Sequence, residues 1–165
     1  MNDGAAIIPE LDELESEIIA LFVRVADMLN LPRSVGEIYG LLFISTDPLC
    51  LDDCRVRLNI SKGSTSQGLK ILRSFGAIRA VYIPGDRKDY YVAETSLRKI
   101  AAGFAKEQIQ PHVASGEDRL LRIRELLDDC ESGNKAELTE KVELLENWQY
   151  RAGKTLPLLL KLIGK

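Results

Sequence analysis

Residues 60–78 concentrate side chains that can bind phosphates and the edges of bases. The stretch reads ISKGSTSQGLKILRSFGAI, with two glycines in its interior although each costs a helix about 1 kcal/mol relative to Ala. Hydroxyl groups and N-terminal backbone N–H groups can donate to phosphate oxygens, and Gln can pair with adenine. Lys and Arg can neutralise phosphates or pair with guanine. The side chains that offer this chemistry are Ser61, Lys62, Ser64, Thr65, Ser66, Gln67, Lys70 and Arg73.

The same stretch has the apolar spacing of an amphipathic helix. Ser61 is predicted to be the N-cap of this helix, and Gly76 is predicted to end it. Gly63 lets the backbone approach a groove closely, whereas Gly68 falls on the apolar side and is predicted to permit close packing against the preceding helix. Ser64 has an alternative role as a cap or packing residue. The side opposite the apolar residues contains no acid and consists of Lys62, Gly63, Ser66, Gln67, Lys70, Arg73 and Ser74.

Two segments rich in strand-forming residues follow, at residues 77–83 and 89–94. Between them, PGDRK at residues 84–88 carries strong turn signals, so the pattern predicts a β-hairpin with a basic tip. Basic side chains at such a tip can enter the minor groove of DNA or contact the flanking backbone. The candidates for these contacts are Arg79, Arg87 and Lys88.

Three further helices are expected before this stretch, over residues 10–29, 34–45 and 51–58. In the second of them, Ser34 and Glu37 match a capping-box pattern. Short connections then lead through the helix that starts at residue 61 to the hairpin. This order predicts a mainly α fold with a small β-hairpin wing, which is the winged helix-turn-helix arrangement.

Charge is distributed unevenly along the chain. Residues 1–54 carry two basic and eleven acidic side chains, a net charge of −9. Residues 100–165 carry ten basic and eleven acidic side chains, a net charge of −1. Residues 55–99 carry ten basic and three acidic side chains, a net charge of +7. This basic segment includes the predicted helix and hairpin tip, as expected for a surface that binds a polyanion. For any one of these residues, a solvated surface charge is the alternative.

Other classes of function lack the residues that they need. The chain has a single histidine, His112, no Gly-rich phosphate loop ahead of a βαβ unit and no set of four metal ligands, so no enzyme, metal or cofactor is predicted. Cys50 and Cys54 are one helical turn apart and Cys130 is distant; ordinary thiols are favoured, with a redox-sensing pair as the alternative. The acidic start and the lack of a long apolar run predict a cytoplasmic chain that does not enter a membrane.

Three motifs resemble the GbsR branch of the MarR-type winged-helix transcription regulators. The resemblance covers residues 31–112, up to the run FAKEQIQPH, and is most specific in ISKGSTSQGL and PGDRKDYY. It implies a homodimer that binds a pseudo-palindromic DNA operator, usually as a repressor, and whose dimer interface is formed by the helices before and after the winged domain. The motifs themselves are LPRSVGEIYGLLFIS, SKGSTSQGLKILRSFGAI and VYIPGDRKDYYVAE.

The helices outside the winged core agree with this implication. After residue 95 the pattern is helical, with breaks expected near 111–116 and at 132–133 and helices over 117–130 and 135–163. Their apolar stripes need a partner, either within the monomer or, as we favour, in a two-fold dimer. The predicted domains are an N-terminal dimerisation helix (1–30), a winged DNA-binding domain (31–95) and a C-terminal helical dimerisation region (96–165).

Two further points concern partners. The alternative function is a winged-helix module that binds proteins without specific DNA binding, against which the acid-free helix side argues. A small-molecule effector of unknown identity is the other partner considered, because some relatives in this branch respond to choline-like or betaine-related compounds. Such a cation requires an aromatic cage, although aromatic residues at helical spacing are mostly core. The available residues are Tyr39, Phe43, Phe104, Trp148 and Tyr150.

Overall fold

A computed structural model describes residues 11–131 and 133–164 of the chain. The fold divides into two compact units, Met1–Ile100 and Ala101–Lys165, and the predicted winged domain lies in the first of them. Among the described residues, no helix combines the length and the apolar character that a bilayer crossing requires.

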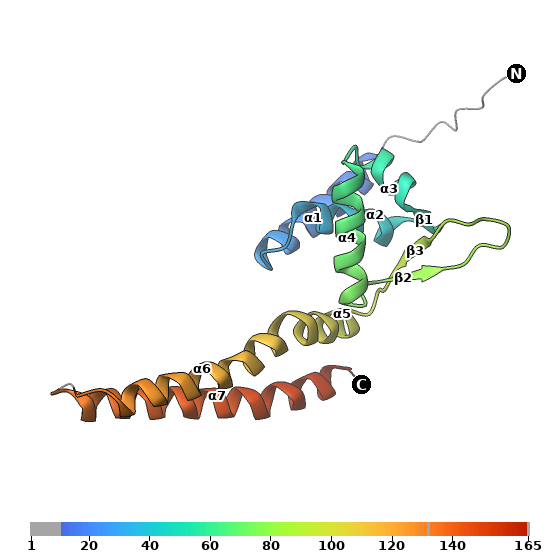
Figure 1. Cartoon of the computed structure of the whole chain (residues 1–165). Coiled ribbons are helices and arrows are strands. Elements are labelled where there is room, and N and C mark those ends of the chain that lie inside the picture. Colours follow the sequence, from blue (N-terminus) through green and yellow to red (C-terminus); the bar gives the residue numbers. More distant parts are fainter. Residues whose placement is uncertain (1–10, 132, 165) are drawn as a thin grey trace, which may run out of the picture. The chain divides into compact units, whose positions relative to one another are not determined.

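The first unit combines a group of packed helices with a three-stranded antiparallel sheet at their edge (Figure 1). Its sheet order is β1-β3-β2, in which β2 and β3 form the predicted hairpin. Tertiary structure therefore confirms the predicted fold class of a mainly helical, winged helix-turn-helix core. The elements are α1 (Glu13–Met28), α2 (Arg33–Ile44), β1 (Leu49–Cys50), α3 (Leu51–Arg57), α4 (Lys62–Ser74), β2 (Ile78–Val81) and β3 (Tyr90–Ala93).

Strand β1 is an addition to the sequence prediction. Leu49 and Cys50 pair with Tyr91 and Tyr90 of β3, which makes the predicted two-stranded wing into a three-stranded sheet. A two-residue strand shows no periodicity, and its partner lies far along the chain. Its existence therefore follows from the tertiary fold and not from local sequence.

The start of α2 differs from the predicted capping box at Ser34 and Glu37. The N-cap is Pro32, and no side chain caps the helix. The backbone N–H of Val35 donates to the Pro32 carbonyl at 2.9 Å, while Arg33 Nε donates to Glu37 Oε1 at 2.7 Å. Because proline already holds φ near the helical value, the helix begins one residue before Ser34, and the capping-box prediction is wrong.

Helices α1 and α2 cross closely at two glycines of α2. A Cβ at Gly36 would lie 2.5 Å from the carbonyl oxygen of Phe22, and one at Gly40 would lie 2.8 Å from the Cα of Ile19. Real Cβ atoms do not approach backbone this closely, so only glycine permits the crossing. This contact joins α1 to the winged domain.

The core of the first unit is centred on α2. Ile38 and Leu41 are fully buried, and α4 contributes Leu69 and Leu72, each 3% exposed. Gly68 is buried as predicted, and a Cβ there would lie 2.5 Å from Ile38 Cδ1. The helix against which Gly68 packs is thus α2, not the immediately preceding α3.

Helix α5 (Leu97–Phe104) contains the boundary between the two units, and the chain continues from it through a π-helical turn, η1 (Ala105–Ile109), into α6 (Gln110–Asp128). These elements follow one another without interruption, so the break predicted near residues 111–116 is wrong. The N–H of Gln110 donates to the carbonyl of Ala105, five residues earlier. This wider turn immediately precedes Pro111, whose ring cannot fit a regular α-helical interior.

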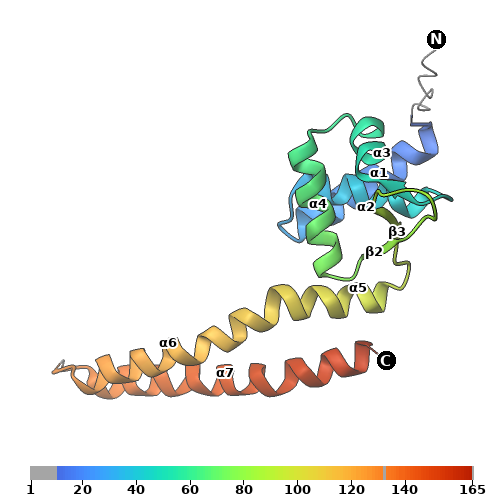
Figure 2. The same ribbon diagram turned by 45° about the vertical axis from the view of Figure 1, so that its right-hand side comes forward.

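Helix α7 (Lys135–Gly164) lies alongside α6 (Figures 1 and 2). Leu127 and Val142 are buried between the two helices, each 7% exposed. Arg124 and Glu146 form an ion pair of 2.8 Å between α6 and α7. The predicted break between these two helices is present, since α6 ends at Asp128 and α7 begins at Lys135. Residue 132 within this connection lies outside the described residues.

Candidate nucleic-acid interface

The first turn of α4 is held by its own hydroxyl groups. Ser61 is the N-cap, as predicted, and its Oγ accepts from the backbone N–H of Ser64 at 3.1 Å. The two hydroxyl oxygens are also 2.9 Å apart and share a hydrogen bond. Ser61 is exposed, whereas Ser64 is half-buried and its backbone N–H and hydroxyl both contact the capping Ser61 side chain.

Thr65 is not on the exposed side of α4, which corrects its prediction as a phosphate donor. Its side chain is fully buried, and its hydroxyl donates to the Ser61 carbonyl at 2.9 Å. At about 100° per residue, Thr65 projects to the same side as Leu69 and Leu72. The helical projection that identified the apolar residues could therefore have excluded Thr65 as well.

The remaining predicted residues of α4 lie together on one exposed side of the helix. We call this side the polar face of α4. It contains no acidic side chain, so nothing on the helix itself repels a phosphate backbone. The polar face consists of Lys62, Gly63, Ser66, Gln67, Lys70, Arg73 and Ser74.

The start of α4 and the base of the wing face a common hollow. Lys62 of α4 and Lys88 of the wing both line it. Its acidic residues are Asp52 and Asp89, of which Asp52 lies 3.9 Å from the guanidinium of Arg55. Tertiary structure thus brings a basic residue of the helix and one of the wing to the same side of the domain.

A second hollow follows along α4 and shares two residues with the first. It is lined by Ser66, Lys70 and Arg73 of the polar face, while Leu51 and Tyr91 line both hollows. Burial raises the pKa of Tyr91, and the nearby Arg73 guanidinium opposes this shift. No local sequence pattern indicates that Leu51 and Tyr91 form the surface between helix and wing.

The wing projects away from the helices as the loop between β2 and β3 (Figure 1). Gly85 has a φ of +87°, a left-handed conformation that glycine adopts without strain. Arg87 and Lys88 are exposed in this loop. Arg79 is exposed in β2, where it pairs with Val92, but it lines neither of the two hollows.

The paired cysteines have the character of structural thiols. Cys50 is 2% exposed and Cys54 is fully buried. Burial raises the pKa of Cys54 to about 12, and the charge of Asp53 adds to this effect. Burial and a hydrogen bond with Asp53 raise the pKa of Cys50. Since the thiolate is the reactive form, this environment disfavours oxidation of the pair.

We expect thiol reagents to distinguish these cysteines from Cys130, which is half-buried in the second unit. At roughly neutral pH, the native protein should react quickly at Cys130 and slowly at Cys50 and Cys54. All three should react in denaturant. Ellman's reagent measures this directly, with Cys130→Ser as the control that removes the fast phase. Fast native labelling of Cys50 or Cys54 would instead support a redox-sensing pair.

The aromatic residues considered for a cage do not gather within one unit. Tyr39 and Phe43 pack with Phe22, at centroid distances of 4.7 and 5.2 Å from it. The Tyr39 hydroxyl donates to the Glu94 carbonyl at 2.7 Å. Phe104, Trp148 and Tyr150 belong to the second unit. The rings of Phe22, Tyr39 and Phe43 therefore pack against one another at the α1–α2 crossing.

The helix order, the small sheet and the basic residues shared by α4 and the wing define a winged helix-turn-helix protein. The HTH-type transcriptional repressor GbsR of Bacillus subtilis strain 168 is 26% identical to it over 143 residues, which are 83% of this chain and 79% of that repressor. The crystal structure of a transcriptional regulator matches with a TM-score of 0.58 and 19% identity, covering 89% of this chain and 98% of the other. No family model matches the chain. The predicted resemblance to GbsR-type regulators is confirmed.

Proposed function

We propose that this chain is a transcriptional regulator that binds double-stranded DNA in a sequence-specific manner, as a homodimeric repressor. The polar face of α4 enters the major groove, and residues 84–88 of the wing enter the minor groove. The observation that carries the proposal is that Lys62, from the acid-free polar face of α4, and Lys88 of the wing line the same hollow. Similarity to a protein named as a repressor supports the direction of regulation.

Each contact residue has a role that its chemistry and exposure allow. Gln67 is exposed and can read adenine with both polar atoms of its amide. The basic side chains neutralise phosphates or read guanine, and Gly63 leaves room for the backbone to approach DNA. Arg79 is assigned to the flanking backbone. The proposed basic contacts of α4 and the wing are Lys62, Lys70, Arg73, Arg87 and Lys88.

A homodimer is proposed because both units expose large apolar side chains. In α1, Leu21 is 58% and Met28 is 83% exposed; in α6 and α7, Leu121 is 66% and Trp148 is 58% exposed. Covering such side chains with a second copy removes apolar surface from water. We assign dimerisation to residues 1–30 and 96–165 and DNA binding to 31–95. Two-fold symmetry would then place two α4 helices about 34 Å apart, one turn of DNA.

DNA binding should respond differently to Gln67→Ala and Arg87→Ala. With a duplex enriched from a random-sequence library by the wild-type protein, each change should weaken binding about tenfold or more. Gln67→Ala should reduce discrimination against random DNA without changing the salt dependence. Arg87→Ala should lower the slope of log affinity against log salt by about one per protomer. Fluorescence anisotropy across a salt series measures both effects.

Arg33→Ala supplies the control, because Arg33 is an exposed arginine of α2 that pairs with Glu37 and is not among the proposed contact or dimerisation residues. It should bind DNA as the wild type does. Light scattering of the complex should give two chains per duplex. Failure to enrich any sequence, with salt-independent binding or none, would favour the protein-binding winged-helix module and reject the proposed function.

A further inference from the structure

An acidic residue occupies the wing beside its two basic residues. Asp86 directly precedes Arg87 and Lys88, on the loop assigned to the minor groove. A carboxylate at a DNA-facing surface repels phosphates, so its presence weakens binding unless it has another effect. Its contacts show what that effect is.

The Asp86 carboxylate closes the loop around Arg87. Oδ1 accepts from the backbone N–H of Lys88 at 2.9 Å, and Oδ2 accepts from the Tyr90 hydroxyl at 2.9 Å. The Asp86 N–H in turn donates to the Ile83 carbonyl at 3.2 Å. Hydrogen bonds therefore connect Asp86 to Lys88, to Ile83 at the loop start and to Tyr90, the first residue of β3.

The ionic state of both partners favours this arrangement. The Lys88 N–H and the Tyr90 hydroxyl hold the pKa of Asp86 below its usual value, so the carboxylate is charged at neutral pH. The same hydrogen bond raises the pKa of Tyr90 to about 12, which keeps its hydroxyl protonated as a donor. Hydrogen bonds to an ionised acceptor are stronger than those between neutral groups.

We propose that Asp86 is a positioning residue of the wing, which fixes the loop so that Arg87 is presented to the DNA. This inference rests on the proposed function. It predicts that an acidic side chain strengthens DNA binding, which is the opposite of what its charge alone would do. The loop loses little freedom on binding when it is already ordered.

Asp89 provides a matched comparison within the same loop. It has the same charge and is exposed. Across residues 11–131 and 133–164, its carboxylate makes neither a hydrogen bond nor an ion pair. Removing Asp89 therefore tests the effect of charge alone, whereas removing Asp86 tests charge together with loop order.

The experiment measures DNA affinity of the full chain with the duplex enriched by the wild-type protein. Asp86→Ala should bind about tenfold more weakly, while Asp89→Ala should bind equally well or more tightly. Asp86→Asn, which retains one acceptor oxygen, should recover part of the loss. In an Arg87→Ala background, Asp86→Ala should cost less than about twofold, because the two residues act as one unit.

A second measurement examines the free protein. ¹⁵N relaxation should show greater motion at the Arg87 and Lys88 amides in Asp86→Ala, and no change in Asp89→Ala. Tighter binding by Asp86→Ala, or an equal cost with and without Arg87, would overturn the positioning role. If the wild type binds no DNA, the proposed function fails, and unchanged relaxation in Asp86→Ala would separately reject the ordering of the loop.

Discussion

Gly36→Ala is expected to lower the free energy of unfolding by about 3 kcal/mol, the upper range for inserting a methyl group into a packed core. The added Cβ would lie 2.5 Å from the Phe22 carbonyl oxygen and 2.6 Å from the Val23 Cα. Both are backbone atoms, so no side-chain rotation can relieve the contact and α1 must move away from α2. The loss should exceed the gain in helix propensity of about 1 kcal/mol from replacing glycine. Thermal unfolding followed by circular dichroism measures the change.

Gly63→Ala is the matched control for this experiment. Gly63 also lies in a helix, but a Cβ there would meet only the Ser61 Oγ, at 3.9 Å. We therefore expect unchanged or slightly higher thermal stability for Gly63→Ala. Equal stability of the two variants would contradict the close crossing of α1 and α2. A lower DNA affinity of Gly63→Ala would be a separate result that concerns the interface.

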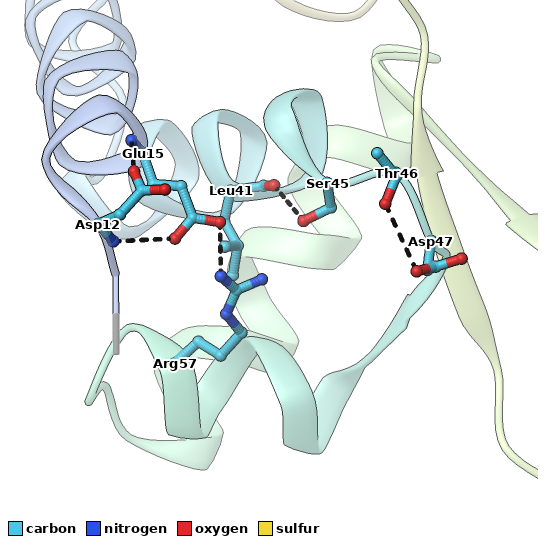
Figure 3. Close-up of polar contacts among 7 residues, drawn as sticks. All are labelled: Asp12, Glu15, Leu41, Ser45, Thr46, Asp47 and Arg57. Carbon is cyan, nitrogen blue, oxygen red and sulfur yellow. Dashed lines mark hydrogen bonds and ion pairs between the residues drawn. The ribbon is translucent and has the colours of Figure 1, made fainter. Parts of the chain in front are cut away.

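Glu15→Ala is expected to cost about 3 kcal/mol of unfolding free energy, because it leaves a mostly buried guanidinium without its partner. Glu15 Oε1 accepts from Arg57 Nη2 at 2.6 Å, with side chains 18% and 13% exposed (Figure 3). Glu15 Oε2 also accepts from the Asp12 backbone N–H, while Asp12 Oδ1 accepts from the Glu15 N–H at 2.7 Å. One carboxylate therefore caps α1 and joins it to the end of α3.

Removing both charges should recover much of this loss. In Glu15→Ala with Arg57→Met, no buried charge is left unpaired, so the double variant should be more stable than Glu15→Ala alone. Glu137→Ala is the control, because Glu137 and its partner Lys141 are 63% and 64% exposed and such pairs contribute about 0.5 kcal/mol. Urea unfolding gives all three values. A double variant less stable than Glu15→Ala would show that Arg57 stabilises the fold without Glu15.

The candidate interface follows from the sequence wherever one helix or one turn determines it. The polar face of α4 is visible from residue spacing, and Ser61 is recognisable as a cap from its type and position. The prediction of Thr65 as a phosphate donor is wrong because its helical angle places it on the apolar, buried side of α4. The contribution of Tyr91 could not be predicted, since it depends on β3 lying beside α4.

Local sequence patterns predict the first four helices and the hairpin in their order, the N-cap of α4, and the basic character of residues 55–99. These features depend on periodicity, turn residues and charge, which act over a few neighbouring residues. Three other features depend on tertiary folding: the pairing of β1 with β3, the crossing at Gly36 and the ion pair of Glu15 with Arg57. Each of these joins residues distant in the chain, and local patterns do not encode which distant surface will cover them.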